Sequence, residues 1–460
     1  MMIPKYEAEQ VLARALSCGG DFAEIYVEHT KENQLSYVNH QVDKLYDNMV
    51  SGASVRVFDG LRCVSASTSD LSLSGLLSCA ARAAEVLGQG KAPVEIHLRE
   101  QIPGDIHPIR VVPAGARISD KLDLVREAYE AAKADSQEIS QVSAELLDFD
   151  HRILVANSEG LFTQDRQIRT RLVVNAVASA GGENQLGSCS PGRRSGLEMF
   201  EEISPGQVGR KAARQAVTML HAGYCPAGQM TVAIENGFGG VIFHEACGHS
   251  LEAESVAAGL SQFGGKLGQK IANEKVTAID DGTIPNAWGS INIDDEGTPA
   301  RKNVLIENGI LKSYLVDKLN GRRMGLDSTA SSRRQSYTFP TTSRMTNTYI
   351  AEGNDDNKEI IASIEDGLYC REMGGGSVNP VTGAFNFAVR EGYRIRNGKI
   401  CEPLRGASLI GTGSEILQNI DMVGKNLEMG QGMCGASSGS IPTNVGQPLV
   451  RVSRITVGGR

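Results

Sequence analysis

Two histidines and a carboxylate lie close together in the stretch VIFHEACGHSLEAE, residues 241–254. His244, Glu245 and His249 form the pattern H-E-x-x-x-H, and no other pair among the eight histidines stands within five residues beside a carboxylate. Two imidazoles suit a borderline cation such as Zn²⁺. A carboxylate directly after the first histidine can act as a general base toward water at that cation. The pattern therefore predicts a hydrolytic metal site.

The spacing of the two histidines is one residue longer than in the zinc-peptidase pattern H-E-x-x-H, which places both imidazoles on one helix face. Positions five apart are about 140° apart on a regular α-helix, so His244 and His249 would diverge. A π-type turn would return them to one face, and we expect Gly248 to lower the cost of that distortion. The alternative is a buried amphipathic helix whose histidines have only structural hydrogen bonds.

A catalytic zinc site needs a third protein ligand and leaves its remaining position for water. No histidine follows His249, so the downstream candidates are Cys370, Cys401 and Cys434, together with several carboxylates. Cys434 stands between glycines in GQGMCGASSG, which let the backbone approach a ligand closely. A free cysteine is, however, more often a small buried hydrophobic residue. Spacing alone does not choose among the three.

A run of three carboxylates at Asp294–Glu296 could bind Ca²⁺ or Mg²⁺. We favour the simpler interpretation, a solvated acidic turn before Gly297.

The composition of the chain excludes several classes of protein. Its 460 residues are too many for one ordinary core and predict two or three domains. The net charge of −8, without longer basic runs, argues against a nucleic-acid partner. The N-terminus lacks an apolar signal segment, and no stretch approaches the ~20 apolar residues of a membrane span. Nine cysteines scattered singly favour a reducing, cytoplasmic compartment.

Apolar periodicity predicts a mixed α/β domain over residues 1–224, which we interpret as a scaffold or dimerisation domain. Helices are expected over residues 6–17, 70–87, 119–132 and 206–221, and strands over residues 23–28, 54–67, 142–147 and 167–178, with a hairpin turn at Asp59-Gly60. The Gly/Ser-rich residues 181–196 are expected to form a mobile loop. We place the domain boundary at Cys225-Pro226.

Residues 225–460 are predicted to form a β-rich domain that carries the metal-binding helix. Asn308-Gly309 and Asn397-Gly398 are strong hairpin signals between strand-like runs. Besides the helix of His244, one helix is expected, over residues 357–365. The predicted fold class is therefore α+β, with a curved or barrel-like antiparallel sheet in the C-terminal domain.

Several blocks of the second half resemble the TldD/PmbA family of metallopeptidases, known also as modulators of DNA gyrase or peptide-maturation proteases. The blocks are FHEACGHSLEAE, DDEGTPA, RMTNTYI, GASLIGTG, and GMCG followed by VGQP and ITVGG. The PmbA-like branch of the family lacks the histidine motif, whereas this chain keeps all of it and so resembles the TldD-like, catalytic branch. The resemblance implies His244, His249 and Cys434 as zinc ligands and Glu245 as the general base.

The resemblance also implies a zinc endopeptidase that acts on peptides or unfolded polypeptide segments, in a homodimer or a heterodimer with a PmbA-like subunit. A free sheet edge beside the metal would bind an extended peptide through its main chain. Arg344 and Asn347, in the RMTNTYI block, are candidates for holding substrate near the metal because arginine offers a rigid donor fork. Asn347 could equally support a turn.

The rival hypothesis is a non-enzymatic protein with a structural zinc ion that modulates a partner protein. Glu245 argues against it, because a structural site needs no base and usually has four protein ligands.

Overall fold

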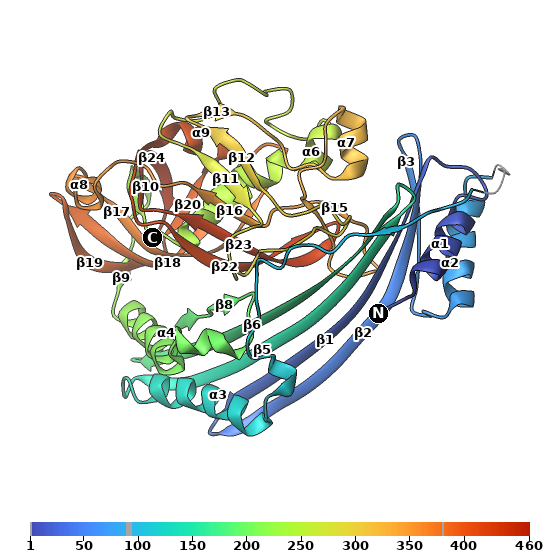
Figure 1. Cartoon of the computed structure of the whole chain (residues 1–460). Helices are drawn as coiled ribbons and strands as arrows, with labels where there is room; N and C mark the ends of the chain where they lie inside the picture. Colours follow the sequence, from blue (N-terminus) through green and yellow to red (C-terminus); the bar gives the residue numbers. More distant parts are fainter. Residues whose placement is uncertain (1, 89–93, 380) are drawn as a thin grey trace.

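The computed structural model describes residues 2–88, 94–379 and 381–460 and confirms the α+β class. The first half forms a long curved sheet whose four longest strands pass beneath the C-terminal half in Figure 1. These are β1 (Phe22–Val38), β2 (Gln41–Asp59), β5 (Ile139–Asn157) and β6 (Leu161–Ala180). The shorter strands are β3 (Arg62–Thr68), β4 (Arg99–Glu100), β7 (Glu183–Cys189) and β8 (Gly192–Arg193). The strand order is β3-β2-β1-β5-β6-β4, with β7 and β8 also paired to β6.

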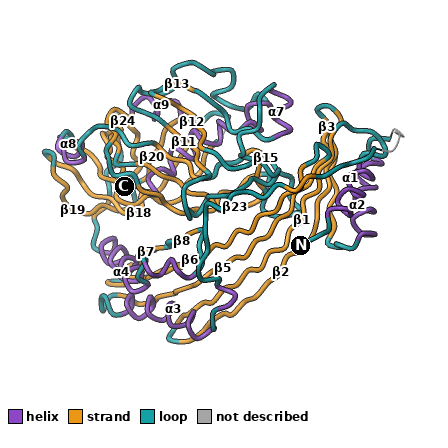
Figure 2. The backbone as a smooth tube through the Cα atoms, in the orientation of Figure 1, coloured by secondary structure: helices purple, strands orange, loops and turns teal. Residues whose placement is uncertain are grey.

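Two pairs of helices pack at the two ends of this sheet, as Figure 2 shows in purple. At one end α1 (Lys5–Ala15) contacts α2 (Leu73–Glu85), and at the other α3 (Ile118–Lys133) contacts α4 (Pro205–Leu220). Each pair buries its apolar stripe in a separate cluster of the core. The four predicted helices of this half and the hairpin at Asp59-Gly60 are confirmed.

The prediction of a mobile loop over residues 181–196 is wrong. Within this range β7 and β8 pair with β6, and α4 packs over β7. A Cβ atom on Gly187 would lie 2.0 Å from the Ala212 carbonyl oxygen of α4. At Gly187, therefore, glycine permits close packing and does not signal mobility.

Five strands of the described C-terminal half close into a barrel, in the order β17-β10-β24-β20-β18 with β18 paired back to β17. They are β10 (Gly228–Ile234), β17 (Asp366–Val378), β18 (Ala384–Arg396), β20 (Ser408–Thr412) and β24 (Val450–Gly458). The predicted barrel-like sheet is confirmed, but β10 and β17 run parallel and the other four pairings are antiparallel. Three further strands attach to this sheet: β9 (Gly223–Tyr224), β19 (Lys399–Arg405) and β21 (Ile420–Val423).

A second sheet lies beside the barrel, in the order β13-β12-β11-β16-β23-β22. Its strands are β11 (Ala278–Asp281), β12 (Lys302–Glu307), β13 (Ile310–Leu311), β16 (Asn347–Ile350), β22 (Glu428–Ala436) and β23 (Gly439–Gln447). A separate pair consists of β14 (Ser332–Arg333) and β15 (Thr342–Ser343). Both predicted hairpins are confirmed, and Asn308 and Asn397 have the positive φ that such turns need, 47° and 48°. Among the described residues, β22 is an edge strand, and on its outer side an isolated bridge joins Met429 to Gly237.

Short helices connect the strands of the C-terminal half. They are α5 (Val241–Phe243), a π-helix (His244–Gly248), a 3₁₀ turn (His249–Leu251), α6 (Ala253–Ala257), α7 (Lys318–Met324), α8 (Asn357–Ala362) and α9 (Gly413–Asn419). The expectation of one helix besides that of His244 was too low, because seven-residue helices such as α7 and α9 are too short to show a periodic apolar pattern. No helix in the described part of the chain is long and apolar enough to cross a membrane.

Candidate metal centre

The chain around His244 follows a π-helix from His244 to Gly248, which confirms the predicted irregular turn. The wider turn brings His244 and His249 to the same face, where their ring centroids lie 5.1 Å apart. The reason for Gly248 differs from the prediction. Its φ of −55° and ψ of −51° are ordinary helical values, but a Cβ atom there would lie 2.3 Å from Met345 Sδ. Gly248 is therefore needed for space and not for backbone freedom.

Three possible metal ligands converge beside this π-helix. Cys434 Sγ, on the edge strand β22, lies 3.1 Å from His244 Nε2 and 3.2 Å from His249 Nε2. The three ligand atoms all lie within 4.8 Å of one another. The other two candidate cysteines lie elsewhere: Cys370 is buried in β17 and Cys401 is exposed on β19.

The chemistry and spacing of this cluster fit a zinc ion. Two imidazoles and one thiolate are common zinc ligands, and ordinary Zn–N and Zn–S bond lengths imply ligand atoms roughly 3.5 Å apart in a tetrahedral site. Burial alone would raise the pKa of the Cys434 thiol, but the charges and hydrogen bonds of His244 and His249 outweigh it and lower that pKa to about 3. Cys434 is therefore a thiolate at neutral pH, the form that binds metals.

Two carboxylates lie next to His249. Glu245 Oε2 is 3.6 Å from His249 Nε2, and its side chain is 28% exposed, so the carboxylate reaches both the cluster and solvent. Glu252, which the sequence interpretation missed, has its Oε2 atom 2.9 Å from His249 Nδ1. Burial would lower the pKa of His249, but the charge and hydrogen bond of Glu252 raise it well above its ordinary value. A carboxylate three residues after the second histidine was the available signal for Glu252.

The two predicted substrate-binding residues are buried and hydrogen-bonded within the chain. Arg344 donates to the carbonyl oxygen of Cys434 at 2.6 Å, so it touches the cluster through the backbone of a ligand. Asn347 donates to the Asp281 carbonyl at 2.6 Å and to Ser290 Oγ at 2.8 Å. Both side chains are 0% exposed. Substrate contact by Arg344 and Asn347 therefore stays a prediction.

The interpretation of Asp294–Glu296 as a solvated acidic turn is wrong, because all three residues are buried. Glu296 accepts a hydrogen bond from Arg56 of β2, which also pairs with Glu24 of β1. Asp294 accepts from the backbone N–H groups of Glu296, Thr298 and Ser332. These contacts dock the second half of the chain onto the long sheet, and N–H donors already use the oxygens that a cation would need.

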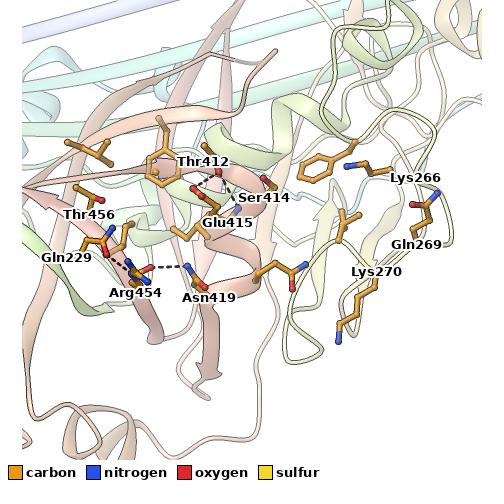
Figure 3. Close-up of a pocket in the computed structure, with 18 residues that line it drawn as sticks. Gln229, Lys266, Gln269, Lys270, Thr412, Ser414, Glu415, Asn419, Arg454 and Thr456 are labelled. Atoms are coloured by element: carbon orange, nitrogen blue, oxygen red, sulfur yellow. Dashed lines mark hydrogen bonds between the residues drawn. The ribbon is translucent and has the colours of Figure 1, made fainter.

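The cluster lies apart from a large surface cleft of about 810 Å³, shown in Figure 3. Lys266 and Lys270 line one side of this cleft and Arg454 lines the other. A second cleft, of about 910 Å³, is lined by Glu428–Gly432, the first half of β22. The second cleft thus borders the strand that carries Cys434, as does a smaller cavity of about 200 Å³ that is lined by Met433.

Family models identify the class of protein that this fold and cluster define. The model of the PmbA/TldA metallopeptidase C-terminal domain matches residues 227–459. The models of the central domain and of domain 1 match residues 113–220 and 23–87. The chain belongs to the PmbA/TldD family of metallopeptidases, which favours an enzyme over the non-enzymatic alternative.

Individual relatives agree with this assignment. The chain is 34% identical to the metalloprotease TldD homologue of Haemophilus influenzae, over 95% of this chain and 93% of the relative. It is 32% identical to the zinc metalloprotease TldD homologue of Saccharolobus solfataricus, over 57% and 58% of the two chains.

Solved structures show the same fold at lower identity. A Thermotoga maritima protein described as a candidate modulator of DNA gyrase has a TM-score of 0.79 at 21% identity, covering 95% of this chain and 96% of that one. TldE from Thermococcus kodakarensis has a TM-score of 0.75 at 18% identity, covering 96% and 97%.

Proposed function

We propose that this metallopeptidase is a zinc endopeptidase in which His244, His249 and Cys434 hold the metal and Glu245 is the general base. The observation that carries the proposal is the convergence of two imidazole nitrogens and one thiolate within 4.8 Å of one another. The zinc named for the Saccharolobus relative supports the same metal. Nine free thiols, counted among the described residues, support a reducing, cytoplasmic compartment.

Each residue around the cluster has a separate role in the proposed hydrolysis. When bound, zinc supplies Lewis acidity toward the scissile carbonyl and the attacking water. Glu245 takes the proton of that water at its carboxylate and passes it to the leaving amine. Its partial exposure of 28% supports this role, because the carboxylate must meet both substrate and water. His249 Nδ1 faces Glu252, which leaves Nε2 for the metal.

We propose that the substrates are peptides or unfolded segments that lie along β22. An edge strand offers unpaired main-chain groups to an extended peptide, with little demand on side-chain identity. The cleft beside Glu428–Gly432 leaves room for such a peptide on the strand that carries Cys434. Most of the main chain of a folded protein is already hydrogen-bonded internally, so we expect folded proteins to be poorer substrates.

We further propose that the chain works as a dimer, with a second copy or with a PmbA-like subunit. Among the described residues, β3 pairs only with residues 53–59 of β2. Residues 41–52 of β2 therefore have no neighbouring strand on the side that faces away from β1. That free edge carries the exposed apolar residues Val42, Leu45, Tyr46 and Met49. Natural proteins protect such edges, and a second chain is one means of doing so.

Zinc analysis combined with a protease assay tests the peptidase proposal. We expect one zinc ion per chain, and we expect the wild type to cleave a denatured protein much faster than its folded form. Cys434→Ser should lose most of the zinc, because a serine hydroxyl stays protonated and binds zinc weakly. Cys401→Ser, on the exposed strand β19, is the matched control and should keep it. Full zinc occupancy in Cys434→Ser, or equal cleavage of folded and denatured substrate, would contradict the proposal.

A further inference from the structure

The candidate ligands come from two segments that only the fold brings together. His244 and His249 lie on the π-helix segment, whereas Cys434 lies 185 residues after His249 on the edge strand β22. An edge strand has a neighbouring strand on one side only. Other contacts must therefore hold the two segments at the separation that a metal ion requires.

Glu252 fixes the ring of His249 on the first segment. Its Oε2 atom lies 2.9 Å from His249 Nδ1, and its side chain is 6% exposed. A carboxylate only accepts hydrogen bonds, so Nδ1 carries the proton. Nε2 is then the ring nitrogen directed at Cys434 Sγ, 3.2 Å away, and the one that a metal ion would take in place of a proton.

Arg344 fixes the second segment. Its Nη2 atom donates to the Cys434 carbonyl at 2.6 Å, and its Nη1 atom donates to Ser438 Oγ at 2.7 Å and to the Gly439 carbonyl at 3.0 Å. Ser438 and Gly439 belong to the turn that joins β22 to β23. One rigid guanidinium thus holds both the backbone of the ligand and the turn that follows it.

The two holding residues also face each other. Arg344 Nε lies 3.8 Å from Glu252 Oε1, and neither atom has a hydrogen-bond partner within the described chain. A buried charge without a partner is strongly destabilising, so each of these residues is the counter-charge of the other. Both side chains are buried, Arg344 at 0% and Glu252 at 6% exposure, so solvent does not neutralise either charge.

We infer that Glu252 and Arg344 form one positioning pair that sets the distance between His249 and Cys434. The inference rests on the proposed function, because it assigns the pair to the same metal centre. Glu252 acts through the His249 ring and Arg344 acts through the Cys434 backbone. Breaking either contact should move one ligand relative to the other without removing any ligand.

Metal affinity measured by chelator competition tests this inference. Losing a residue that orients a metal ligand typically weakens metal binding about 10–100-fold. We expect that loss of zinc affinity for Glu252→Ala and for Arg344→Met, and a smaller loss for Glu252→Gln, whose amide oxygen still accepts from Nδ1–H. In the cobalt-substituted protein, both Arg344→Met and Arg344→Lys should reduce the thiolate-to-cobalt absorption band. Because the pair acts as a unit, Glu252→Ala with Arg344→Met should lose less affinity than the product of the two single losses.

Glu254→Gln is the matched control, since Glu254 lies two residues away and contacts Ser437 on the same turn without touching a ligand. It should keep wild-type affinity and the wild-type cobalt spectrum. Circular dichroism of the metal-free proteins establishes that each variant is folded, and Arg344→Lys replaces Arg344→Met if the latter does not fold. Wild-type affinity in folded Glu252→Ala, or single losses that simply multiply, would overturn this inference alone. A wild type that binds no zinc would overturn the proposed function as well.

Discussion

At the scale of single residues, the two carboxylates beside His249 have separate tasks. Glu252 is buried and its Oε2 atom faces Nδ1, the ring nitrogen away from the cluster. Glu245 is partly exposed and lies 3.6 Å from Nε2, on the side of the ligand atoms. The two glutamates are the same residue type. Their burial and the ring nitrogen that each one faces distinguish the orienting carboxylate, Glu252, from the candidate base, Glu245.

Glu245→Gln is expected to slow hydrolysis severely while the protein keeps its metal. Glutamine preserves size and hydrogen bonding but cannot accept the proton of water, and general-base catalysis typically contributes about 10²–10⁴-fold to the rate. Turnover of a denatured substrate should fall by that factor, while zinc measured by mass spectrometry stays at the wild-type level. Glu415→Gln, at the cleft of Figure 3 and away from the cluster, is the control and should turn over normally. Normal turnover in zinc-replete Glu245→Gln would refute the proposed base.

At the scale of elements, the site depends on a π-helix packed closely against a neighbouring segment. The π-helix puts the two histidines on one face, and Gly248 lets Met345 approach that turn. A five-residue spacing therefore gives the convergence that the common zinc-peptidase helix obtains with four. The same contact makes the turn sensitive to one added methyl group.

Gly248→Ala is expected to destabilise the protein by about 1–3 kcal/mol, the usual cost of adding volume to a packed interior. The added Cβ atom would lie 2.3 Å from Met345 Sδ, so the turn or the methionine must move. The free energy of unfolding in denaturant measures the cost, which should shrink in a Met345→Ala background. Gly435→Ala is the control, because a Cβ atom there meets nothing within 4 Å. An equal cost in both methionine backgrounds would count against this contact as the cause.

At the scale of the whole molecule, buried polar contacts join the first half of the chain to the C-terminal half. Some come from the long sheet and others from the segment that precedes α3. His107, which precedes α3, receives a hydrogen bond from the Asn286 N–H at Nδ1. Its Nε2 atom then carries the proton and donates to the Ile291 carbonyl at 3.1 Å. The contact at Nδ1 requires a neutral ring, because a protonated Nδ1 cannot accept a hydrogen bond, and His107 is only 2% exposed.

The His107 contacts are expected to make stability depend on pH. Burial, and next the charge of Arg194, lower the pKa of His107 from 6.5 to about 4. Between pH 6.5 and about 4, His107 is protonated in the unfolded chain but neutral in the folded chain. The free energy of unfolding therefore decreases as the pH falls through this range. The metal-free wild type should lose up to about 1.4 kcal/mol per pH unit more than His107→Gln, as measured by denaturant unfolding. If the free energy of unfolding depended on pH in the same way for both proteins, this prediction would be contradicted.

The free edge of β2 is expected to mediate dimerisation. Light scattering of the purified chain, alone or mixed with a PmbA-like subunit, should show a dimer, and closed two-fold dimers are the commonest oligomers. Leu45→Lys should weaken it, because an edge lysine disfavours strand pairing. Ile102→Lys, also at an exposed apolar position but away from β2, should not. A stable, fully active wild-type monomer in both preparations would rule the dimer out.

Much of the fold followed from local sequence signals. The helices of the first half have long apolar stripes, and the turns at Asn308 and Asn397 combine asparagine with glycine, so short-range chemistry decides them. The histidine spacing likewise required an irregular turn, because a regular helix would have separated the two rings. The local signals failed at residues 181–196 and at Asp294–Glu296, where glycines and carboxylates resemble loop residues until their neighbours are known.

What only the tertiary structure decided is which distant groups meet. Cys370, Cys401 and Cys434 are equivalent by residue type, and only the pairing of β22 with β23 places Cys434 against the π-helix. Burial has the same character: the residue type of Arg344, a candidate for substrate contact, does not reveal that its side chain is 0% exposed and holds the Cys434 backbone. The physical reason is that residue type and spacing determine the backbone over a few residues. Contacts between residues more than a hundred positions apart depend instead on how whole strands and helices pack.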